Sequence, residues 1–155
     1  MSKTLILAAA GAGKTHRIAK ESIDRIGSGS RVLAITYTES NQAELARKYT
    51  DLGGGQGDKF HVKGLFTFLL EDIIRPYQHR IFGQRIPGIC FNDSDPHKRN
   101  GRNIPGRRER LADGKYNPSY FLSTDAGRAH TTYLAKLATR IISVTGGSPI
   151  RRLGA

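Results

Sequence analysis

The chain has 155 residues, of which 37 % are hydrophobic, a length that suits one ordinary domain and suffices to bury a core. Its 25 Lys/Arg against 13 Asp/Glu give a net charge of +12, which favours a polyanionic partner. No apolar run approaches the roughly 18 residues of a membrane helix, and the single cysteine, Cys90, excludes an internal disulfide, so we expect a cytoplasmic protein without a membrane partner.

The first element is an apolar segment at residues 4–7, which predicts a buried strand, and the residues after it resemble a phosphate-binding loop. Glycines in such a loop let backbone N–H groups point at a polyphosphate, Lys14 reaches its outer phosphates, and the Thr15 hydroxyl can hold Mg²⁺. Helical spacing over residues 16–26 places a positive helix end beside the same anion. A secretory signal fits less well, because the apolar segment is short.

We therefore predict a P-loop (Walker A) that binds ATP with Mg²⁺. Lys14 and Thr15 are the catalytic candidates, and Thr15 is the metal-binding candidate through the nucleotide. The predicted contacts to the nucleotide come from eight consecutive residues: Ala8, Ala9, Ala10, Gly11, Ala12, Gly13, Lys14 and Thr15.

The next elements alternate between strands and helices. The pattern predicts a strand at 31–36, a helix at 40–49, a glycine loop at 53–57, a short strand at 60–62 and an apolar helix from 65 that ends at Arg75-Pro76. This order is typical of an α/β fold with a parallel sheet and flanking helices. We expect the partial sheet of a P-loop NTPase domain.

The second half of the chain has a different character. Residues 80–118 are rich in Gly, Pro, Asn, Asp and Arg and predict an irregular basic insert that is not core. Helical spacing resumes over 125–142, with Ser123 or Thr124 as the N-cap, and residues 145–149 predict a turn or loop. The expected organisation is an ATP-binding part at 1–79 and a basic insert with a C-terminal helix at 80–155.

Positive charge is concentrated in this second half. Residues 97–155 hold twelve Lys/Arg against three Asp/Glu, whereas residues 1–96 hold thirteen against ten. Such a concentration favours binding to nucleic acid, and the candidate contacts are Arg99, Arg102, Arg107 and Arg108. The alternative is a solvated basic loop without a partner.

Three segments, in this order and spacing, resemble the first three motifs of UvrD/Rep-type superfamily 1 DNA helicases: Ala8–Thr15, then Ile35–Thr38 with Ala43–Leu45, then Gly64–Leu70. The resemblance covers about residues 3–77. It departs from the family pattern at Tyr37, at Glu39–Gln42, at Phe66 and at Thr67. It implies the ATP-binding part of an ATP-dependent helicase or translocase that acts on single-stranded or partly duplex DNA.

The resemblance also implies four DNA contacts. Thr38 would contact a DNA phosphate, and Tyr37 would stack on a base, although a half-buried strand position suits Tyr37 equally well. Phe66 and Thr67 would lie on the DNA side. For Phe66 the apolar face around it favours a core position.

The Asp-Glu (Walker B) motif of the family has no counterpart, because Glu71-Asp72 continues into helical spacing and predicts a solvent-facing helix surface. We therefore expect an N-terminal piece of a helicase, truncated before that motif, that binds ATP without the parts for hydrolysis. The alternatives are a small P-loop kinase and a non-catalytic, basic nucleic-acid-binding remnant. The histidines show no metal-ligand spacing.

Overall fold

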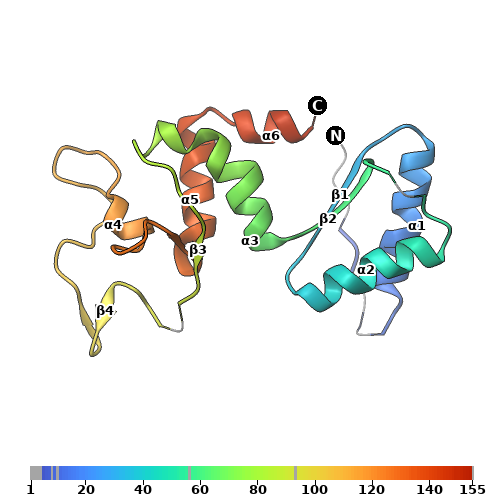
Figure 1. Ribbon diagram of the computed structural model, residues 1–155, viewed down its shortest axis with the longest axis horizontal. Coiled ribbons are helices and arrows are strands. Elements are labelled where there is room, and N and C mark those ends of the chain that lie inside the picture. Colours follow the sequence, from blue (N-terminus) through green and yellow to red (C-terminus); the bar gives the residue numbers. More distant parts are fainter. Residues whose placement is uncertain (1–4, 8, 10, 56, 93, 155) are drawn as a thin grey trace. The chain divides into compact units, whose positions relative to one another are not determined.

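The computed structural model describes residues 5–7, 9, 11–55, 57–92 and 94–154. It divides into two compact units, residues 1–65 and 66–155 (Figure 1). Each unit contains helices and a short parallel sheet, so the chain has an α/β fold, as its sequence predicts.

Unit 1 is a strand–helix–strand arrangement preceded by a helix. Its elements are α1 (Lys14–Gly27), β1 (Val32–Thr36), α2 (Glu39–Asp51) and β2 (Phe60–Gly64). The two strands pair in parallel, with Val32 opposite Phe60 and Thr36 opposite Gly64. A parallel pair needs a crossover, and α2 provides it. The predicted helix at 16–26, strand at 31–36, helix at 40–49 and strand at 60–62 are confirmed.

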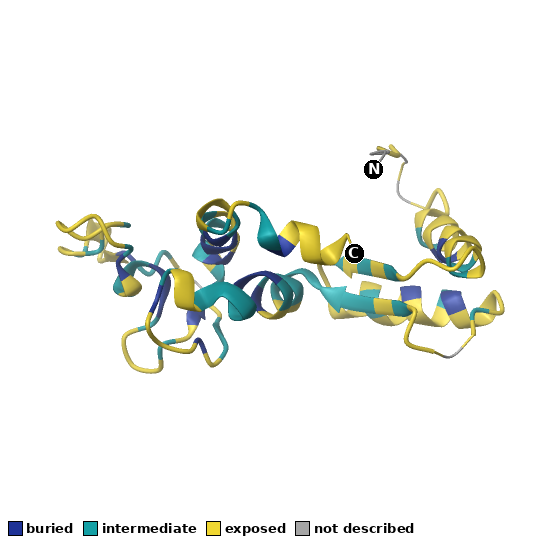
Figure 2. Ribbon diagram, turned by 90° about the horizontal axis from the view of Figure 1, so that it is seen from above, coloured by how far each residue is buried: buried dark blue, intermediate teal, exposed yellow. Residues whose placement is uncertain are grey.

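Alternation along β1 and β2 decides which side chains enter the core of unit 1. Ala34, Phe60 and Val62 lie on the sheet face that packs against both helices, whereas Leu33 and Ile35 are exposed on the other face. The helices contribute Ala19, Leu45 and Tyr49, which are buried, together with the half-buried Ile23 and Ile26. The remaining helix surface is mostly exposed, and Figure 2 shows this for α1 and α2.

The predicted strand at the amino terminus is not formed by its described residues. Residues 5–7 lie in neither helix nor strand, and Leu5 and Leu7 are 85 % and 86 % exposed. Thr4 lies outside the described residues. A strand is stabilised only when its backbone pairs with a neighbour, and in the described sheet of unit 1 each strand pairs with the other alone. The prediction of a buried strand at 4–7 is therefore wrong for residues 5–7.

Unit 2 begins with a long helical run of changing pitch. The run consists of α3 (Leu65–Phe68), the π-helical turn η1 (Leu69–Ile74) and the 3₁₀ helix η2 (Arg75–Arg80). The prediction that the helix ends at Arg75-Pro76 is wrong, because the run continues to Arg80. Pro76 changes the pitch without ending the run, since proline lacks the N–H that would bond to the carbonyl of Asp72. The Arg152 guanidinium donates to that carbonyl at 2.7 Å.

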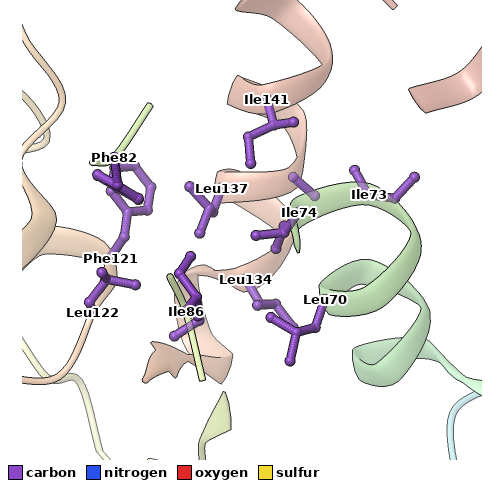
Figure 3. Close-up of a cluster of buried hydrophobic side chains, with 12 residues drawn as sticks. Leu70, Ile73, Ile74, Phe82, Ile86, Phe121, Leu122, Leu134, Leu137 and Ile141 are labelled. Carbon is purple, nitrogen blue, oxygen red and sulfur yellow. The ribbon is translucent and has the colours of Figure 1, made fainter. Parts of the chain in front are cut away.

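The core of unit 2 forms around α5 (Thr131–Val144). In Figure 3, Leu70 and Ile74 lie on the side of α5 that faces η1, and Phe82 and Ile86 lie on another side. The sequence analysis placed 80–118 outside the core, and Phe82 (3 % exposed) and Ile86 (fully buried) correct that expectation. Isolated apolar residues in an irregular segment carry no periodicity, so their burial depends on where the loop runs.

The rest of unit 2 consists of very short elements. These are β3 (Ile89–Cys90), β4 (Lys98–Arg99), β5 (Arg102–Asn103), α4 (Pro118–Phe121) and β6 (Ala129–His130). Strands β3 and β6 pair in parallel, and β4 and β5 form an antiparallel hairpin. The irregular character predicted for residues 80–118 is confirmed for most of the segment.

Two helix boundaries near the carboxyl end differ from the sequence prediction. Helix α5 begins at Thr131 with His130 at the N-cap, so neither Ser123 nor Thr124 caps it. Ser123 closes a turn instead: its carbonyl accepts from the Gly127 N–H at 3.0 Å, and its hydroxyl accepts from the Arg128 N–H at 3.1 Å. The positive φ of Gly127 (60°) interrupts helical geometry there.

The second difference concerns the last helix. The turn predicted from residue 145 is confirmed through residue 147, but Ser148–Leu153 form α6. Pro149 lies in the first turn of α6, where proline is favoured because its missing N–H has no helical partner in any case. The prediction of a turn or loop is therefore wrong for residues 148 and 149.

Candidate functional site

The predicted phosphate loop leads directly into α1. Gly11 and Gly13 both have left-handed backbone conformations, with φ of 76° and 73°, and Gly13 is the N-cap of the helix. The Ala12 N–H donates to the Ala9 carbonyl at 3.3 Å, which closes a turn ahead of the helix. Ala8 and Ala10, the other two predicted contacts, lie outside the described residues.

This backbone geometry suits an anion. Successive N–H groups in a left-handed residue followed by a helical one form a concave arrangement that binds anions, and Gly13 with Lys14 has this form. The first N–H groups of α1 have no partner within the helix and carry its positive end. A Cβ on Gly11 or Gly13 would meet nothing within 4 Å, so open space adjoins the loop at both glycines.

Lys14 and Thr15 occupy the first turn of α1. The Lys14 ammonium folds back on the loop and donates to the Ala9 carbonyl at 2.6 Å. Thr15 is half-buried beside it. A cavity of about 180 Å³ adjoins this turn and is lined by Ala12, Lys14 and Arg17 together with the apolar Ile6, Leu7 and Ile18. Two cations at this cavity make it suitable for a negatively charged group.

The residues after β1 lie at the carboxyl end of the strand. The Thr38 hydroxyl accepts from the Asn41 N–H at 3.2 Å and is therefore the N-cap of α2, a role that the sequence analysis did not assign. Tyr37 is 69 % exposed, so the alternative of a half-buried strand position is wrong. Tyr37 directly precedes Thr38, so its exposed ring is next in the chain to the amino end of α2.

Phe66 and Thr67 belong to α3, at the start of unit 2. Phe66 is half-buried and packs against the core cluster of that unit, with an edge-to-face contact to Phe91 at 6.0 Å between ring centroids. This is the core position that its apolar surroundings favour. Thr67 is exposed. Glu71-Asp72 lies in η1, which agrees with the helical interpretation of that pair.

The four candidate arginines fall into two pairs. Arg99 and Arg102 are exposed and stand directly opposite each other in the β4–β5 hairpin. Arg107 is half-buried, and its guanidinium donates to the Ser119 carbonyl, which anchors it to α4. Arg108 is exposed beside it. Three of the four arginines are therefore exposed.

A larger cavity in unit 2 was not anticipated from the sequence. It has a volume of about 680 Å³, and its lining includes His97, Arg107, Arg108, Tyr120 and Tyr133. These residues are up to 36 positions apart in the sequence, so no local spacing could have grouped them. The only sequence feature that could have indicated this cavity was the presence of tyrosines within the basic half of the chain.

Aromatic stacking and charge define this cavity. His97, 8 % exposed, stacks on Tyr120 with ring centroids 4.3 Å apart, and it packs against Tyr133 at a tilt of 36° with centroids 4.4 Å apart. Burial lowers the pKa of His97, although the nearby Asp95 carboxylate opposes this, so the ring is neutral at physiological pH. Asp95 accepts from the Tyr133 hydroxyl at 3.0 Å, and burial followed by this bond raises the pKa of Tyr133 to about 12.

An ion-pair network lies behind the aromatic residues. Glu109 accepts from Arg140 at 2.6 Å and pairs with Lys136 at 2.9 Å. The Arg140 hydrogen bond, followed by that of Lys136, lowers the pKa of the Glu109 carboxyl. Lys136 also donates to the Tyr120 hydroxyl at 2.9 Å, which positions this tyrosine.

Two further searches of the described residues were negative. No group of three or more His, Cys, Asp or Glu side chains within this part of the chain is arranged to hold a metal ion. Among the helices that the structure describes, none combines the length and the apolar character that crossing a membrane requires.

Comparison with known proteins identifies the family. No curated protein and no solved structure matches the chain. A protein-family model, however, does match: the UvrD/REP helicase N-terminal domain, over residues 1–101, a span that contains the candidate loop, β1 with Thr38, and the β4 strand of the hairpin. The chain therefore belongs to the UvrD/Rep helicase family.

Proposed function

We propose that the loop at residues 8–15 binds ATP as its Mg²⁺ complex, within the P-loop NTPase (RecA-like) part of a DNA helicase or translocase that acts on single-stranded DNA. Residues 1–79 would form this ATP-binding part and residues 80–155 a basic insert with its helix. Membership of the UvrD/Rep family supports a helicase-like function. The conformation of the loop itself is the observation that carries the nucleotide proposal.

The described residues of the loop fit a polyphosphate. Left-handed Gly13 turns the backbone so that the first N–H groups of α1 point out of the helix end, and Lys14 and Arg17 supply positive charge beside them. Thr15, in the same first turn, has the hydroxyl that a nucleotide-bound Mg²⁺ requires. A bound Mg²⁺ would neutralise phosphate charge, and the protein residues would hold and orient the phosphates.

The hydrogen bond between Lys14 and Ala9 has a clear role in this proposal. A carbonyl is a weaker partner for an ammonium group than a phosphate is, because the phosphate carries a full negative charge. When a triphosphate enters the loop, the Lys14 ammonium would exchange the Ala9 carbonyl for a phosphate oxygen. The bond thus keeps the side chain beside the loop before nucleotide binds.

DNA would contact unit 1 at the amino end of α2. The Thr38 oxygen accepts from Asn41, so the hydroxyl hydrogen can be donated to a phosphate oxygen. The helix end adds positive potential at the same place. The Tyr37 ring, next in the chain, is 69 % exposed, and we propose that it stacks on a base.

A calorimetric titration of Mg²⁺–ATP tests the nucleotide proposal. The folded chain should release or absorb heat on binding, and Lys14→Ala should weaken the affinity at least about tenfold, because a charge-assisted bond contributes about 1.5–3 kcal/mol. Lys20→Ala removes the same charge from an exposed position of the same helix and should leave the affinity unchanged. Absence of any binding heat in a folded chain would refute the proposal.

The Mg²⁺ role of Thr15 has a separate test. Thr15→Ala should make the ATP affinity insensitive to Mg²⁺, whereas Thr15→Ser, which keeps the hydroxyl, should preserve the dependence. Equal Mg²⁺ dependence in both variants would assign the metal contact to another residue. We expect binding without appreciable hydrolysis by this chain, since the Asp-Glu motif has no counterpart in its sequence.

A further inference from the structure

The turn of the β4–β5 hairpin consists of Asn100 and Gly101, two residues that can react with each other. Both are exposed, and both have a positive φ, 52° and 75°, as a type I′ turn requires. Asn100 is the only residue other than glycine with a positive φ in the part of the chain that the structure describes. The hairpin thus presents an asparagine to solvent in a conformation that few side chains adopt.

No hydrogen bond to a described residue holds the two groups that would react. Neither the side-chain amide of Asn100 nor the backbone N–H of Gly101 has such a partner. Gly101 has no Cβ, so its nitrogen is sterically open to the preceding side chain. The space around the turn is open as well, because a Cβ built on Gly101 would meet nothing within 4 Å.

The turn can reach the conformation that a reaction between these groups requires. Rotation of the peptide group between Asn100 and Gly101 converts a type I′ turn into a type II′ turn and keeps the positive φ of the first residue. Gly101 adopts either sign of φ, so the rotation is sterically allowed. A five-membered ring that joins the Asn100 side chain to the Gly101 nitrogen needs a backbone torsion ψ of Asn100 near that of the type II′ turn.

The charge of the hairpin favours the same reaction. The attacking species is the Gly101 nitrogen after loss of its proton, and positive neighbours stabilise such an anion. Lys98, Arg99 and Arg102 all lie within three positions of this nitrogen. Asp95, 3.8 Å from Lys98, is the only acidic partner of these three cations among the described residues, so most of their charge is uncompensated.

From these observations we propose that Asn100 is a site of spontaneous deamidation. The Gly101 nitrogen bonds to the side-chain carbonyl carbon of Asn100, the bond from that carbon to the amide nitrogen breaks, and ammonia leaves with the proton lost by Gly101. Water then opens the cyclic imide and leaves aspartate or isoaspartate. The reaction is a substitution followed by a hydrolysis and needs no oxidant or reductant. Its product places a negative charge between Arg99 and Arg102, which stand directly opposite each other, and reduces their repulsion.

The other four asparagines of the chain are internal controls, because each lacks one requirement. In two of them the nitrogen that follows is already bonded. The nitrogen after Asn41 donates to the Thr38 carbonyl at 3.1 Å, and the nitrogen after Asn103 donates to the His97 carbonyl at 2.7 Å. Attack by either nitrogen would first break that hydrogen bond.

The remaining two controls differ from Asn100 in other ways. Asn117 is followed by Pro118, which has no N–H to lose. The side chain of Asn92 is held at both ends, since its amide nitrogen donates to the Cys90 sulfur at 3.8 Å and its oxygen lies 2.9 Å from His130 Nδ1. Asn100 alone combines an open nitrogen with an unbonded amide.

Peptide mapping of the folded chain tests the proposal. The chain is stored at neutral pH in heavy-oxygen water, digested with pepsin in acid and analysed by mass spectrometry. Asn100 should lose ammonia and take up heavy water at least about tenfold faster than any other asparagine, which corresponds to about 1.4 kcal/mol of activation free energy. If Asn100 stays unchanged in the folded chain and reacts only in urea, the hairpin protects it and the proposal is overturned.

Two glycine variants test the role of the pair. Gly101→Ala places a Cβ beside the attacking nitrogen and should slow the modification of Asn100 at least about tenfold. Gly114→Ala is the matched control: it also alters a glycine with a positive φ (81°) and open surroundings, but in another turn, and it should leave the rate unchanged. Equal rates in the two variants would refute attack by the Gly101 nitrogen.

The charge change also has a consequence for DNA binding, and this part alone rests on the proposed function. Asn100→Asp represents one product, and aspartate tolerates the left-handed conformation. Its charge offsets that of one arginine, so the slope of log affinity for oligothymidylate against log salt should decrease in magnitude by up to about 0.7. An unchanged slope would refute this consequence, and no binding at low salt would refute the DNA part of the proposed function. The mass measurement tests deamidation independently of both.

Discussion

The Lys14 ammonium donates a hydrogen bond of 2.6 Å to the Ala9 carbonyl, five residues earlier in the chain. This bond joins the first turn of α1 to the start of the loop and places the positive charge where left-handed Gly13 turns the backbone. The Lys14 ammonium thus lies beside the backbone N–H groups at the start of α1. The nucleotide proposal depends on this proximity more than on any other feature.

Gly13, like Gly11, has a left-handed backbone conformation, and it is also the N-cap of α1. Alanine at a φ of 73° costs about 1–2 kcal/mol, so Gly13→Ala should destabilise the start of α1 and weaken Mg²⁺–ATP binding. Gly27→Ala, at the other end of the helix, meets no positive φ and no steric contact and should change neither. Urea unfolding and calorimetry measure the two effects. Equal behaviour of the variants would show that the loop needs no left-handed residue.

Thr38 combines a structural and a proposed DNA-binding role, and two substitutions separate them. Thr38→Ala removes the cap of α2 and should cost about 1 kcal/mol. Thr38→Asp keeps a capping oxygen and should retain stability, but its charge repels a phosphate, so it should weaken binding to oligothymidylate. Urea unfolding and fluorescence anisotropy provide the measurements. Undiminished DNA affinity in Thr38→Asp would exclude a phosphate contact at this residue.

Phe82 and Phe91 offer a matched test of the core of unit 2. Phe82 is 3 % exposed, and its replacement by alanine should cost about 3–5 kcal/mol. Phe91 is 73 % exposed, and the same replacement should cost under about 1 kcal/mol. Chemical denaturation followed by near-ultraviolet circular dichroism compares them. Similar losses for both would mean that residues 80–118 do not contribute to the core.

The stability of unit 2 should fall in acid because of two buried histidines. Burial lowers the pKa of His97 and of His130 below the ordinary value of 6.5, and Arg107 lowers both further, while Asp95 opposes the shift of His97. Below that value the unfolded chain binds more protons than the folded chain does. The free energy of unfolding should therefore decrease by up to about 1.4 kcal/mol per pH unit for each histidine.

Urea titrations at about pH 7 and about pH 5 measure this loss. His97→Phe keeps an aromatic ring against Tyr120 but cannot be protonated, so it should lose less stability between the two conditions than the unaltered chain does. The control is His61→Phe, at an exposed position of β2, which should behave as the unaltered chain. If His97→Phe loses as much stability as the control between the two pH values, protonation of His97 does not cause the loss of stability in acid.

Local patterns in the sequence predicted unit 1 well. Periodicity located α1, β1, α2 and β2, because each element packs one face on a common core and therefore carries a regular apolar spacing. The turn of the loop was predicted from the presence of glycine at positions 11 and 13. Both residues have the left-handed conformation, which glycine adopts without steric cost. These are properties of short segments, which a sequence displays directly.

Features that depend on distant contacts could not be predicted. Residues 5–7 have the composition of a strand, but a strand forms only with a neighbour to pair with. The helical run continues past Pro76, and the Asp72 carbonyl accepts from Arg152, which lies far along the chain. The cavity likewise gathers His97, Tyr120 and Tyr133 from separate segments. No spacing rule connects such residues before the fold is known.

Amide chemical shifts of the loop test the central claim most directly. On addition of Mg²⁺–ATP to the isotopically labelled chain, the backbone N–H signals of Gly11 and Gly13 should shift strongly and saturably, since these groups would face the phosphates. Amides of the glycine turn at Gly53 and Gly54 serve as an internal reference and should stay in place. Saturable shifts confined to other segments, with the loop signals unchanged, would contradict the account.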